Sequence, residues 1–186
     1  INPVGAVSSG LEVLDDAEMD QTMQDAAMDL IRTGASKAIA LLTYARLAYG
    51  AAGGFGAQIN LDDAKKAMEG VFASAKADLE WRIGEGYGPK ENVKTLLILG
   101  HAASESVPRG GVVRIEGDIA NFRIEATGKK VLLQDDFVRA LGGDSSDLTP
   151  KFSPAFIVSK LAKEAGARVR ARLDGEMAIF EANFPE

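Results

Sequence analysis

The opening segment, INPVGAVSSGLEVLDD, is the feature that most limits what this chain can fold into. Its apolar residues recur at spacings of three and four, which places them on one face of a helix over residues 1–16. A longer segment, 21–52, repeats this periodicity, and the polar stretch 15–20 between them suits a short turn. The sequence therefore predicts an antiparallel helical hairpin. Its apolar stripes comprise Val4, Val7, Leu11 and Leu14, and then Met23, Ala27, Leu30, Ile31, Ala38, Leu41, Leu42 and Ala45.

A hairpin of two helices cannot bury both apolar stripes well by itself. Two hairpins from two copies of the chain would form a four-helix bundle and bury the stripes in a shared core. The alternative is that the stripes pack against the remainder of the same chain. We expect the homodimer, with an interface that includes Leu11, Leu14, Leu30, Ile31 and Leu42.

A segment rich in glycine and alanine, GAAGGFGAQ at 50–58, follows the predicted hairpin. Its Gly-Phe-Gly could suggest a phosphate-binding loop. It follows a helix rather than a strand, however, and no Gly-Lys-Ser/Thr comes after it, so we interpret it as a linker. We expect a hairpin domain at 1–52, a linker at 53–59 and a second domain at 60–186.

The second domain has the mixed texture of an α/β sandwich. Asn60 is a candidate N-cap for the first helix, and Ser153 followed by Pro154 marks the start of the last. The fold class is therefore α+β, with an antiparallel-rich sheet covered by helices on one face. Helices are expected at 61–74, 89–107, 130–141 and 153–166, and strands at 77–83, 112–117, 121–127 and in a C-terminal hairpin turning at Asp174-Gly175.

Composition excludes several classes of function. The chain has no Cys and one His, so disulfides and thiolate or His-rich metal sites are ruled out, and we expect no metal site. A formal net charge of −6 without a basic cluster argues against a nucleic-acid partner. No apolar run reaches the about 18 residues that a membrane-spanning helix needs. We expect a cytoplasmic protein with no membrane segment.

The hairpin followed by an α/β layer is the order found in sensor histidine kinases, and the sequence resembles more closely the bacterial histidine phosphotransferases of the ChpT type. The resemblance rests on INPVGAVSSGLEVLDD, LLTYARLAYGAAGG at 41–54, PRGG at 108–111 and the C-terminal EAGARVRARLDGEMAIFEANFP. In that family a phosphorylated His lies five residues before the Pro that matches Pro3. The resemblance thus implies an acceptor His three residues before Ile1, and none within the numbered chain. Without the resemblance, the interpretation of Pro3 is that it lies in the first turn of a helix that begins at this point of the chain.

The resemblance also implies a function. The protein would shuttle a phosphoryl group between response-regulator receiver domains, including that of a hybrid kinase, without ATP-dependent kinase activity. The receiver would supply the Asp and Mg²⁺, so no cofactor and no ATP are expected here. Arg46 could contact phosphoryl oxygens, or it could be a solvated cation at a helix end. Residues expected near the acceptor or in receiver docking are Asn2, Pro3, Ala6 and Ser9 on the first helix and Tyr44, Arg46 and Tyr49 at the end of the second.

His101 is the only histidine of the chain, and it lies in LLILGHAASES within the second domain. In kinases the equivalent stretch carries an Asn that helps to hold Mg-nucleotide, and ATGKKVLLQ stands here in place of the kinase Asp-x-Gly-x-Gly. The resemblance therefore implies that nucleotide binding is lost and that His101 is a helix residue without a functional role. Two alternatives stay open: an ATP-binding kinase-like protein, which Mg-dependent ATP binding would reveal, and a nonenzymatic dimeric adaptor, which the absence of an upstream His would support.

Overall fold

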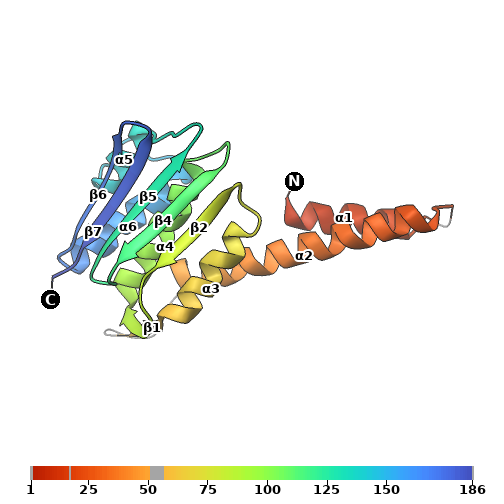
Figure 1. Ribbon diagram of the computed structural model, residues 1–186, viewed down its shortest axis with the longest axis horizontal. Coiled ribbons are helices and arrows are strands. Elements are labelled where there is room, and N and C mark those ends of the chain that lie inside the picture. The colour runs from red at the N-terminus through yellow and green to blue at the C-terminus, as the bar shows by residue number, and fades with distance from the viewer. Residues whose placement is uncertain (1, 17, 51–56, 186) are drawn as a thin grey trace. The chain divides into compact units, whose positions relative to one another are not determined.

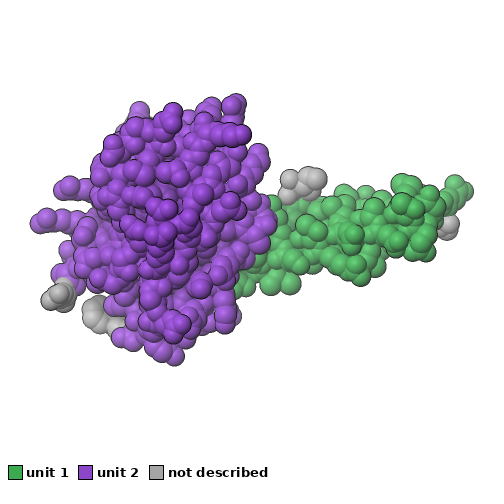
Figure 2. All heavy atoms as spheres, viewed as in Figure 1, with its two compact units in different colours: residues 1–43 green, residues 44–186 purple. Residues whose placement is uncertain are grey.

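The structure, a computed structural model, describes residues 2–16, 18–50 and 57–185. The chain forms two compact units, and the division between them lies between Thr43 and Tyr44 (Figure 2). No helix among the described residues combines the length and the hydropathy that crossing a membrane requires.

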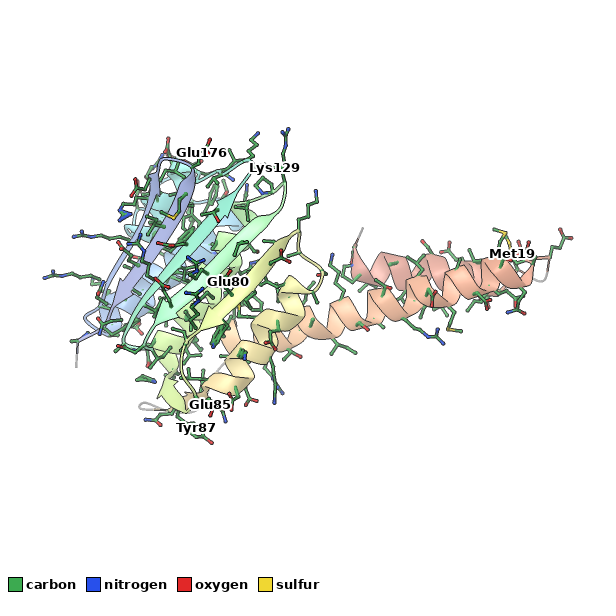
Figure 3. The ribbon with its side chains drawn as sticks, viewed as in Figure 1. Met19, Glu80, Glu85, Tyr87, Lys129 and Glu176 are labelled. Atoms are coloured by element: carbon green, nitrogen blue, oxygen red, sulfur yellow. The ribbon has the colours of Figure 1, made fainter. Side chains whose placement is uncertain are left out.

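The first unit contains the predicted hairpin (Figure 1). Helix α1 spans Pro3–Leu14, and helix α2 spans Gln21–Tyr49. Met19 lies in the turn between them (Figure 3). Two glycines allow the helices to approach closely, because a Cβ on Gly10 would lie 2.8 Å from the Ala27 carbonyl oxygen and one on Gly34 would lie 2.7 Å from that of Pro3. This backbone proximity explains why α2 keeps a glycine in its interior despite a cost of about 1 kcal/mol relative to Ala.

The start of α1 has the geometry of a capped helix terminus. Asn2 is extended, and its side-chain oxygen accepts a hydrogen bond of 3.1 Å from the backbone N–H of Val4. Pro3 occupies the first helical position, where its missing N–H costs nothing and its fixed φ suits the helix. This is the first-turn arrangement that the residues favour without the family resemblance.

The boundary between the two units differs from the predicted linker. Residues 51–56, most of that linker, lie outside the described residues. The structure places the division about two turns earlier, inside α2, because the last turns of this helix belong to the second unit. Tyr44 and Ala48 are buried there, and Lys94 donates a hydrogen bond of 2.6 Å to the carbonyl oxygen of Gly50. The two compact units therefore divide inside the predicted hairpin domain of 1–52.

The second unit is built on a five-stranded sheet with the strand order β2-β4-β5-β7-β6. Strands β2 and β4 pair in parallel, and the other neighbours are antiparallel, as the sequence predicted for an antiparallel-rich sheet. The strands span Ala77–Arg82 (β2), Gly111–Gly117 (β4), Asn121–Gly128 (β5), Arg168–Asp174 (β6) and Met177–Asn183 (β7).

Helices cover one face of this sheet, as predicted (Figure 1). The most deeply buried is α4, in which Leu96, Leu97 and Leu99 are inaccessible to water and form the core with Ile115 and Phe180 of the sheet. The helices span Leu61–Phe72 (α3), Lys90–Glu105 (α4), Asp135–Leu141 (α5) and Ser153–Glu164 (α6), with a 3₁₀ turn at Pro150–Phe152 (η1) and a two-stranded ribbon of Gln58–Asn60 (β1) and Tyr87–Pro89 (β3).

Local signals are confirmed at some helix ends and wrong at others. Asn60 caps α3 as predicted, since its side chain accepts a bond of 2.7 Å from the N–H of Asp62. Ser153 is the first helical residue of α6 rather than its N-cap, because η1 leads directly into this helix. The helix predicted at 130–141 is shortened to α5. Leu132 instead donates its N–H to the carbonyl oxygen of Ser106 at 2.8 Å, which holds residues 131–134 outside the helix.

The C-terminal hairpin turns one residue later than predicted. Asp174 pairs with Met177, so the two turn residues are Gly175 and Glu176. Gly175 has a φ of +58°, a conformation that glycine adopts without steric cost. Glu176 lies at this turn, at one end of the sheet (Figure 3).

Candidate functional site

The residues expected at the start of α1 differ in exposure. Asn2 and Ser9 are exposed, and Pro3 is half-buried. Ala6 is buried at 7% exposure, because it faces α2 beside Gly34. Its side chain belongs to the hairpin interior, which corrects the expectation that Ala6 contributes to an exposed docking face.

The register of the hairpin fixes which part of α2 lies opposite the start of α1. Gly34 is opposite Pro3, and Gly10 is opposite Ala27 and Ile31. The helices are therefore antiparallel, with the start of α1 beside the middle of α2.

Tyr44, Arg46 and Tyr49 follow Gly34, which lies beside Pro3, Ala6 and Val7, by 10 to 15 residues along α2. The acceptor expected before Ile1 lies outside the described residues, so the proximity of these three residues to it stays a prediction.

The end of α2 is a packed aromatic cluster within the second unit. Tyr44 is 4% exposed, and its hydroxyl donates a bond of 3.5 Å to the carbonyl oxygen of Leu97. Its ring lies 5.1 Å from that of His101 and 6.0 Å, edge to face, from that of Tyr49. Burial raises the pKa of Tyr44 far above its usual value, and that of Tyr49 rises for the same reason. Both phenols therefore stay protonated, and Tyr44 is a core residue rather than part of a docking surface.

Arg46 and Tyr49 complete the end of α2. Tyr49 is 41% exposed. Arg46 is exposed in the last turn of α2, where its positive charge interacts favourably with the helix dipole. The burial of Lys94 lowers its pKa while its ammonium group bonds Gly50. This hydrogen bond between Lys94 and Gly50, which no local sequence signal predicts, holds the end of α2 against α4.

A small cavity lies beside His101 in the second unit. It has a volume of about 60 Å³, whereas pockets for drug-sized ligands are commonly about 300–1,000 Å³. Phe137 and Phe180 meet edge to face at 5.8 Å at its wall, and the ammonium group of Lys151 donates to the Gln134 side chain at 3.1 Å. The cavity lining includes Ile98, His101, Glu105, Leu132, Leu133, Gln134, Phe137, Phe152 and Phe180.

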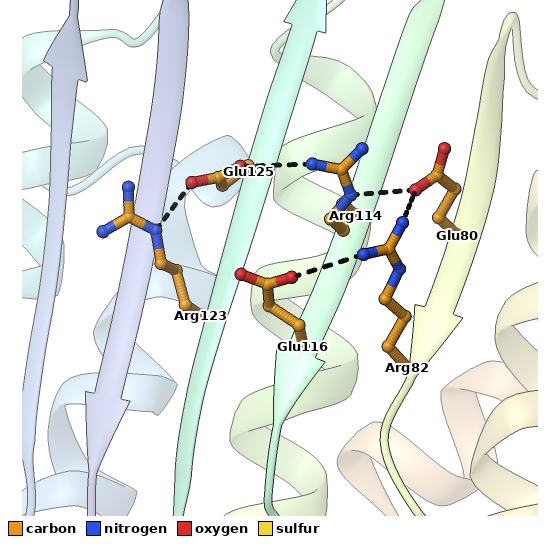
Figure 4. Close-up of polar contacts among 6 residues, drawn as sticks. All are labelled: Glu80, Arg82, Arg114, Glu116, Arg123 and Glu125. Carbon is orange, nitrogen blue, oxygen red and sulfur yellow. Dashed lines mark hydrogen bonds and ion pairs between the residues drawn. The ribbon is translucent and has the colours of Figure 1, made fainter.

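The open face of the sheet carries a ladder of ion pairs (Figure 4). Arg114 lies 2.8 Å from Glu80 and 3.8 Å from Glu125, and Arg123 lies 2.7 Å from Glu125. Arg82 joins the same Glu80 at 2.9 Å. A hydrogen bond from Arg114 lowers the pKa of Glu80, so this carboxylate stays ionised. The charges satisfy one another, which is the behaviour of a solvated face rather than of a ligand site.

Metal ligands do not converge within residues 2–16, 18–50 and 57–185. No group of three or more His, Cys, Asp or Glu side chains there could hold an ion. The acceptor His expected three residues before Ile1 lies outside the numbered chain.

A helical hairpin followed by a sheet with helices on one face defines the fold class of histidine kinase domains. The histidine kinase domain of the blue-light-activated kinase from Erythrobacter litoralis EL346 superposes with a TM-score of 0.51 over 98% of this chain and 95% of that chain. At 13% identity this likeness concerns the fold alone.

Relatives with higher identity define the family. A family model for the histidine phosphotransferase C-terminal domain matches residues 61–177. Protein phosphotransferase ChpT of Brucella abortus (strain 2308) is 32% identical over 188 residues, which cover 98% of this chain and 88% of the relative. A solved bacterial phosphotransferase is 29% identical, with a TM-score of 0.83 over 97% of this chain and 88% of that one. The chain belongs to the histidine phosphotransferase family.

Proposed function

We propose that this protein relays a phosphoryl group between response-regulator receiver domains in the cytoplasm, through a His three residues before Ile1. The observation that carries the proposal is the INPVGA segment, whose residues 3–6 begin α1, in a chain of the histidine phosphotransferase family. Asn2 and Ser9 are exposed on this helix, so a receiver could contact them.

The proposed reaction has two symmetrical steps. A ring nitrogen of the His attacks the phosphorus of a receiver aspartyl phosphate, and the second receiver's carboxylate later removes the phosphoryl group from the His. The transition state of phosphoryl transfer is loose, so positioning and charge stabilisation contribute most of the catalysis. The receiver contributes the Asp and its Mg²⁺, and this chain contributes the helix that carries the nucleophile.

The same proposal includes a homodimer formed by two hairpins. Leu11 is 50% exposed and Leu42 is 70% exposed, and Val4 and Ile39 add further exposed apolar surface at 67% and 65%. Leu14 and Leu30 are half-buried. Ile31 lies against Gly10 inside the hairpin, so it contributes less to a dimer interface than expected. A second hairpin would remove the exposed stripe from water, which is favourable by about 25 cal/mol for each Å² of apolar surface.

We also propose that the second unit works without ATP. Leu132 and Leu133, at the end of the ATGKKVLLQ segment that stands in place of the kinase glycine motif, and Phe137 line the small cavity with apolar side chains. His101 occupies the position of the kinase Asn and packs against Tyr44. Calorimetric titration with Mg-ATP should detect no binding, and tight Mg-dependent binding would favour the kinase-like alternative.

The test of the relay uses two lengths of the native protein. A phosphorylated receiver is incubated with the chain starting at Ile1 and with the chain extended upstream through its native residues. The extended protein should carry acid-labile, base-stable phosphate, and replacing its upstream His with Ala should abolish the label. Labelling of the chain that starts at Ile1 would place the acceptor within this numbering, and an extended protein without a His would support the adaptor alternative.

A further inference from the structure

Strand β6 forms one edge of the five-stranded sheet (Figure 1). It pairs with β7 on one side, and no other described strand lies on its second side. Within the described part of the chain, residues 168–174 exchange no backbone hydrogen bond outside the ladder with β7. Because a strand directs its N–H and C=O groups to both sides, β6 keeps a row of free backbone donors and acceptors along its outer side.

The charged side chains on the open face of the sheet alternate in sign from strand to strand. The strand register places Arg82, Glu116, Arg123, Glu181 and Arg170 in one row across β2, β4, β5, β7 and β6. Directly opposite side chains share a face, and opposite charges in such positions attract. Arg82 lies 3.8 Å from Glu116, and Arg123 lies 2.9 Å from Glu181. The row therefore ends at the sheet edge on a positive charge.

Three arginines occupy this edge. Arg168, Arg170 and Arg172 stand at alternate positions of β6, so all three lie on the open face, and all three are exposed. Arg172 lies 3.8 Å from Glu181, a carboxylate that also pairs with β5. Arg168 and Arg170 line a hollow of about 330 Å³ and form no ion pair with any residue that the structure describes. Two positive charges at the edge are thus left without a counter-charge, in a chain whose net charge is −6.

We propose that β6 is a docking strand for an extended acidic segment of a partner protein, which adds to the sheet as a further strand. Backbone hydrogen bonds to the outer side of β6 supply affinity, and acidic side chains at alternate positions continue the charge rows beyond Arg168, Arg170 and Arg172. Asp174, the next open-face residue of β6, calls for a basic residue opposite it. An antiparallel segment that matches β6 therefore has the order basic-x-acidic-x-acidic-x-acidic.

The intervening residues of the segment are expected to be apolar or β-branched. They lie on the side of the sheet that the helices cover, next to Val169, Ala171 and Leu173 of β6. Leu173 is 49% exposed, so an added strand removes apolar surface from water at this edge.

Charge also disfavours a second copy of β6 as the occupant. Two antiparallel copies related by twofold symmetry, whether centred on Arg170 or on Arg172, place an arginine directly opposite itself. Like charges in directly opposite positions are destabilising. The edge thus rejects its own copy while it attracts a strand of opposite charge.

The first experiment uses a synthetic peptide with blocked ends, Lys-Val-Glu-Thr-Glu-Val-Glu, titrated into the full ¹⁵N-labelled chain at low salt. We expect saturable binding, amide shifts centred on residues 167–175 and slower hydrogen exchange of the outward amides of β6, because these amides gain hydrogen bonds. A control peptide has the same composition with its three glutamates consecutive. It should bind about fivefold more weakly or less, since its charges no longer fall on one face.

Charge reversal tests the residue-by-residue match. Arg170→Glu breaks no ion pair among the described residues, and it should weaken binding about tenfold, because an attractive pair becomes repulsive. Lysine at the fifth peptide position should restore binding to this variant, whereas lysine at the third position, which faces Arg172, should not. Arg109→Glu is the matched control, because Arg109 is exposed in the turn before β4, which β5 and β7 separate from β6. Its affinity should stay within about twofold of the parent.

Three results would overturn the proposal. If the alternating peptide does not bind, the arginines only protect the edge against pairing with other sheets. Equal affinity for the two peptides, or an equal loss in Arg109→Glu, would show that binding follows net charge rather than strand addition. Shifts centred on elements other than β6 would place the peptide elsewhere. Circular dichroism of each variant verifies that the sheet is intact, so that a lost affinity reports the contact.

Discussion

Gly10 of α1 and Ile31 of α2 approach so closely that a Cβ on Gly10 would come within 2.5 Å of Cγ1 of Ile31. The same Cβ would lie 2.8 Å from the carbonyl oxygen of Ala27, which is backbone and cannot move without shifting α2. Gly10 therefore sets the distance between the helices, and through it the register that aligns Pro3 with Gly34.

Replacing this glycine should destabilise the hairpin. Gly10→Ala gains about 1 kcal/mol of helix propensity but loses about 1–3 kcal/mol to overpacking, so we expect a net loss. Gly5→Ala is the matched control on the same helix, because its Cβ would meet only Asn2 Cβ, at 3.8 Å. The control should gain about 0.5–1 kcal/mol. Chemical denaturation followed by circular dichroism measures both, and equal stabilisation of the two variants would contradict the close approach.

Leu42 provides the sharpest test of the dimer. It is 70% exposed in one copy, so Leu42→Asp should leave a single hairpin intact while it places an unpaired charge in the interface between two. Light scattering should then report a monomer. Thr33→Asp is a suitable control, because Thr33 is also exposed on α2 but lies on the side of the helix roughly opposite Leu42. Two variants that remain equally dimeric would exclude the Leu42 face as the interface.

Much of the fold follows from local chemistry in the sequence. The periodicity of the hairpin and the cap at Asn60 are encoded by residues close together in the chain, and both are confirmed. The C-terminal hairpin is also confirmed, although its turn at Gly175 and Glu176 lies one residue later than predicted. The shortened α5 was missed because the bond between Leu132 and Ser106 joins segments far apart in sequence. An apolar run such as KVLLQ fits a helix equally well until that partner is known.

The candidate site was harder to predict for a related reason. The position of Tyr44 relative to the start of α1 depends on how the two helices are staggered, which apolar periodicity does not give. α2 is much longer than α1, and only the contacts of Gly10 and Gly34 determine which of its residues lie opposite Pro3. Ala6 is small and Tyr44 is amphipathic, and residues of both kinds are common on protein surfaces. Their burial therefore depends on tertiary packing, which the sequence alone does not show.

Asp144 should be an unusually acidic carboxyl group. Hydrogen bonds from the side chain and backbone of Ser146, followed by one from Arg139, lower its pKa to about 2 from 3.8. Because the folded pKa lies below the unfolded value, its stabilising contribution is present above pH 3.8 and is lost as the pH falls toward 2. Carboxyl ¹³C NMR should give this midpoint. Ser146→Ala should raise the pKa, and an unchanged midpoint would remove Ser146 as the cause.

His101 tests whether the only histidine of the numbered chain takes part in transfer. Its ring packs on the buried Tyr44, 5.1 Å between centroids, in α4 of the second unit. His101→Ala in the upstream-extended protein should lower the free energy of unfolding by about 0.5–1.5 kcal/mol through loss of this ring contact. The rate of phosphoryl acceptance should nevertheless stay within about twofold of the parent, since the nucleophile that the transfer needs lies upstream.

A comparison with His101→Phe separates packing from chemistry. Phenylalanine keeps an aromatic ring against Tyr44 but has no nitrogen that could accept a phosphoryl group, so it should retain more stability than Ala and the same transfer rate. Thermal unfolding and labelling by a phosphorylated receiver would be measured on both variants. If each variant folds and dimerises normally but neither is labelled, the imidazole of His101 is the acceptor, and the assignment through Pro3 is wrong.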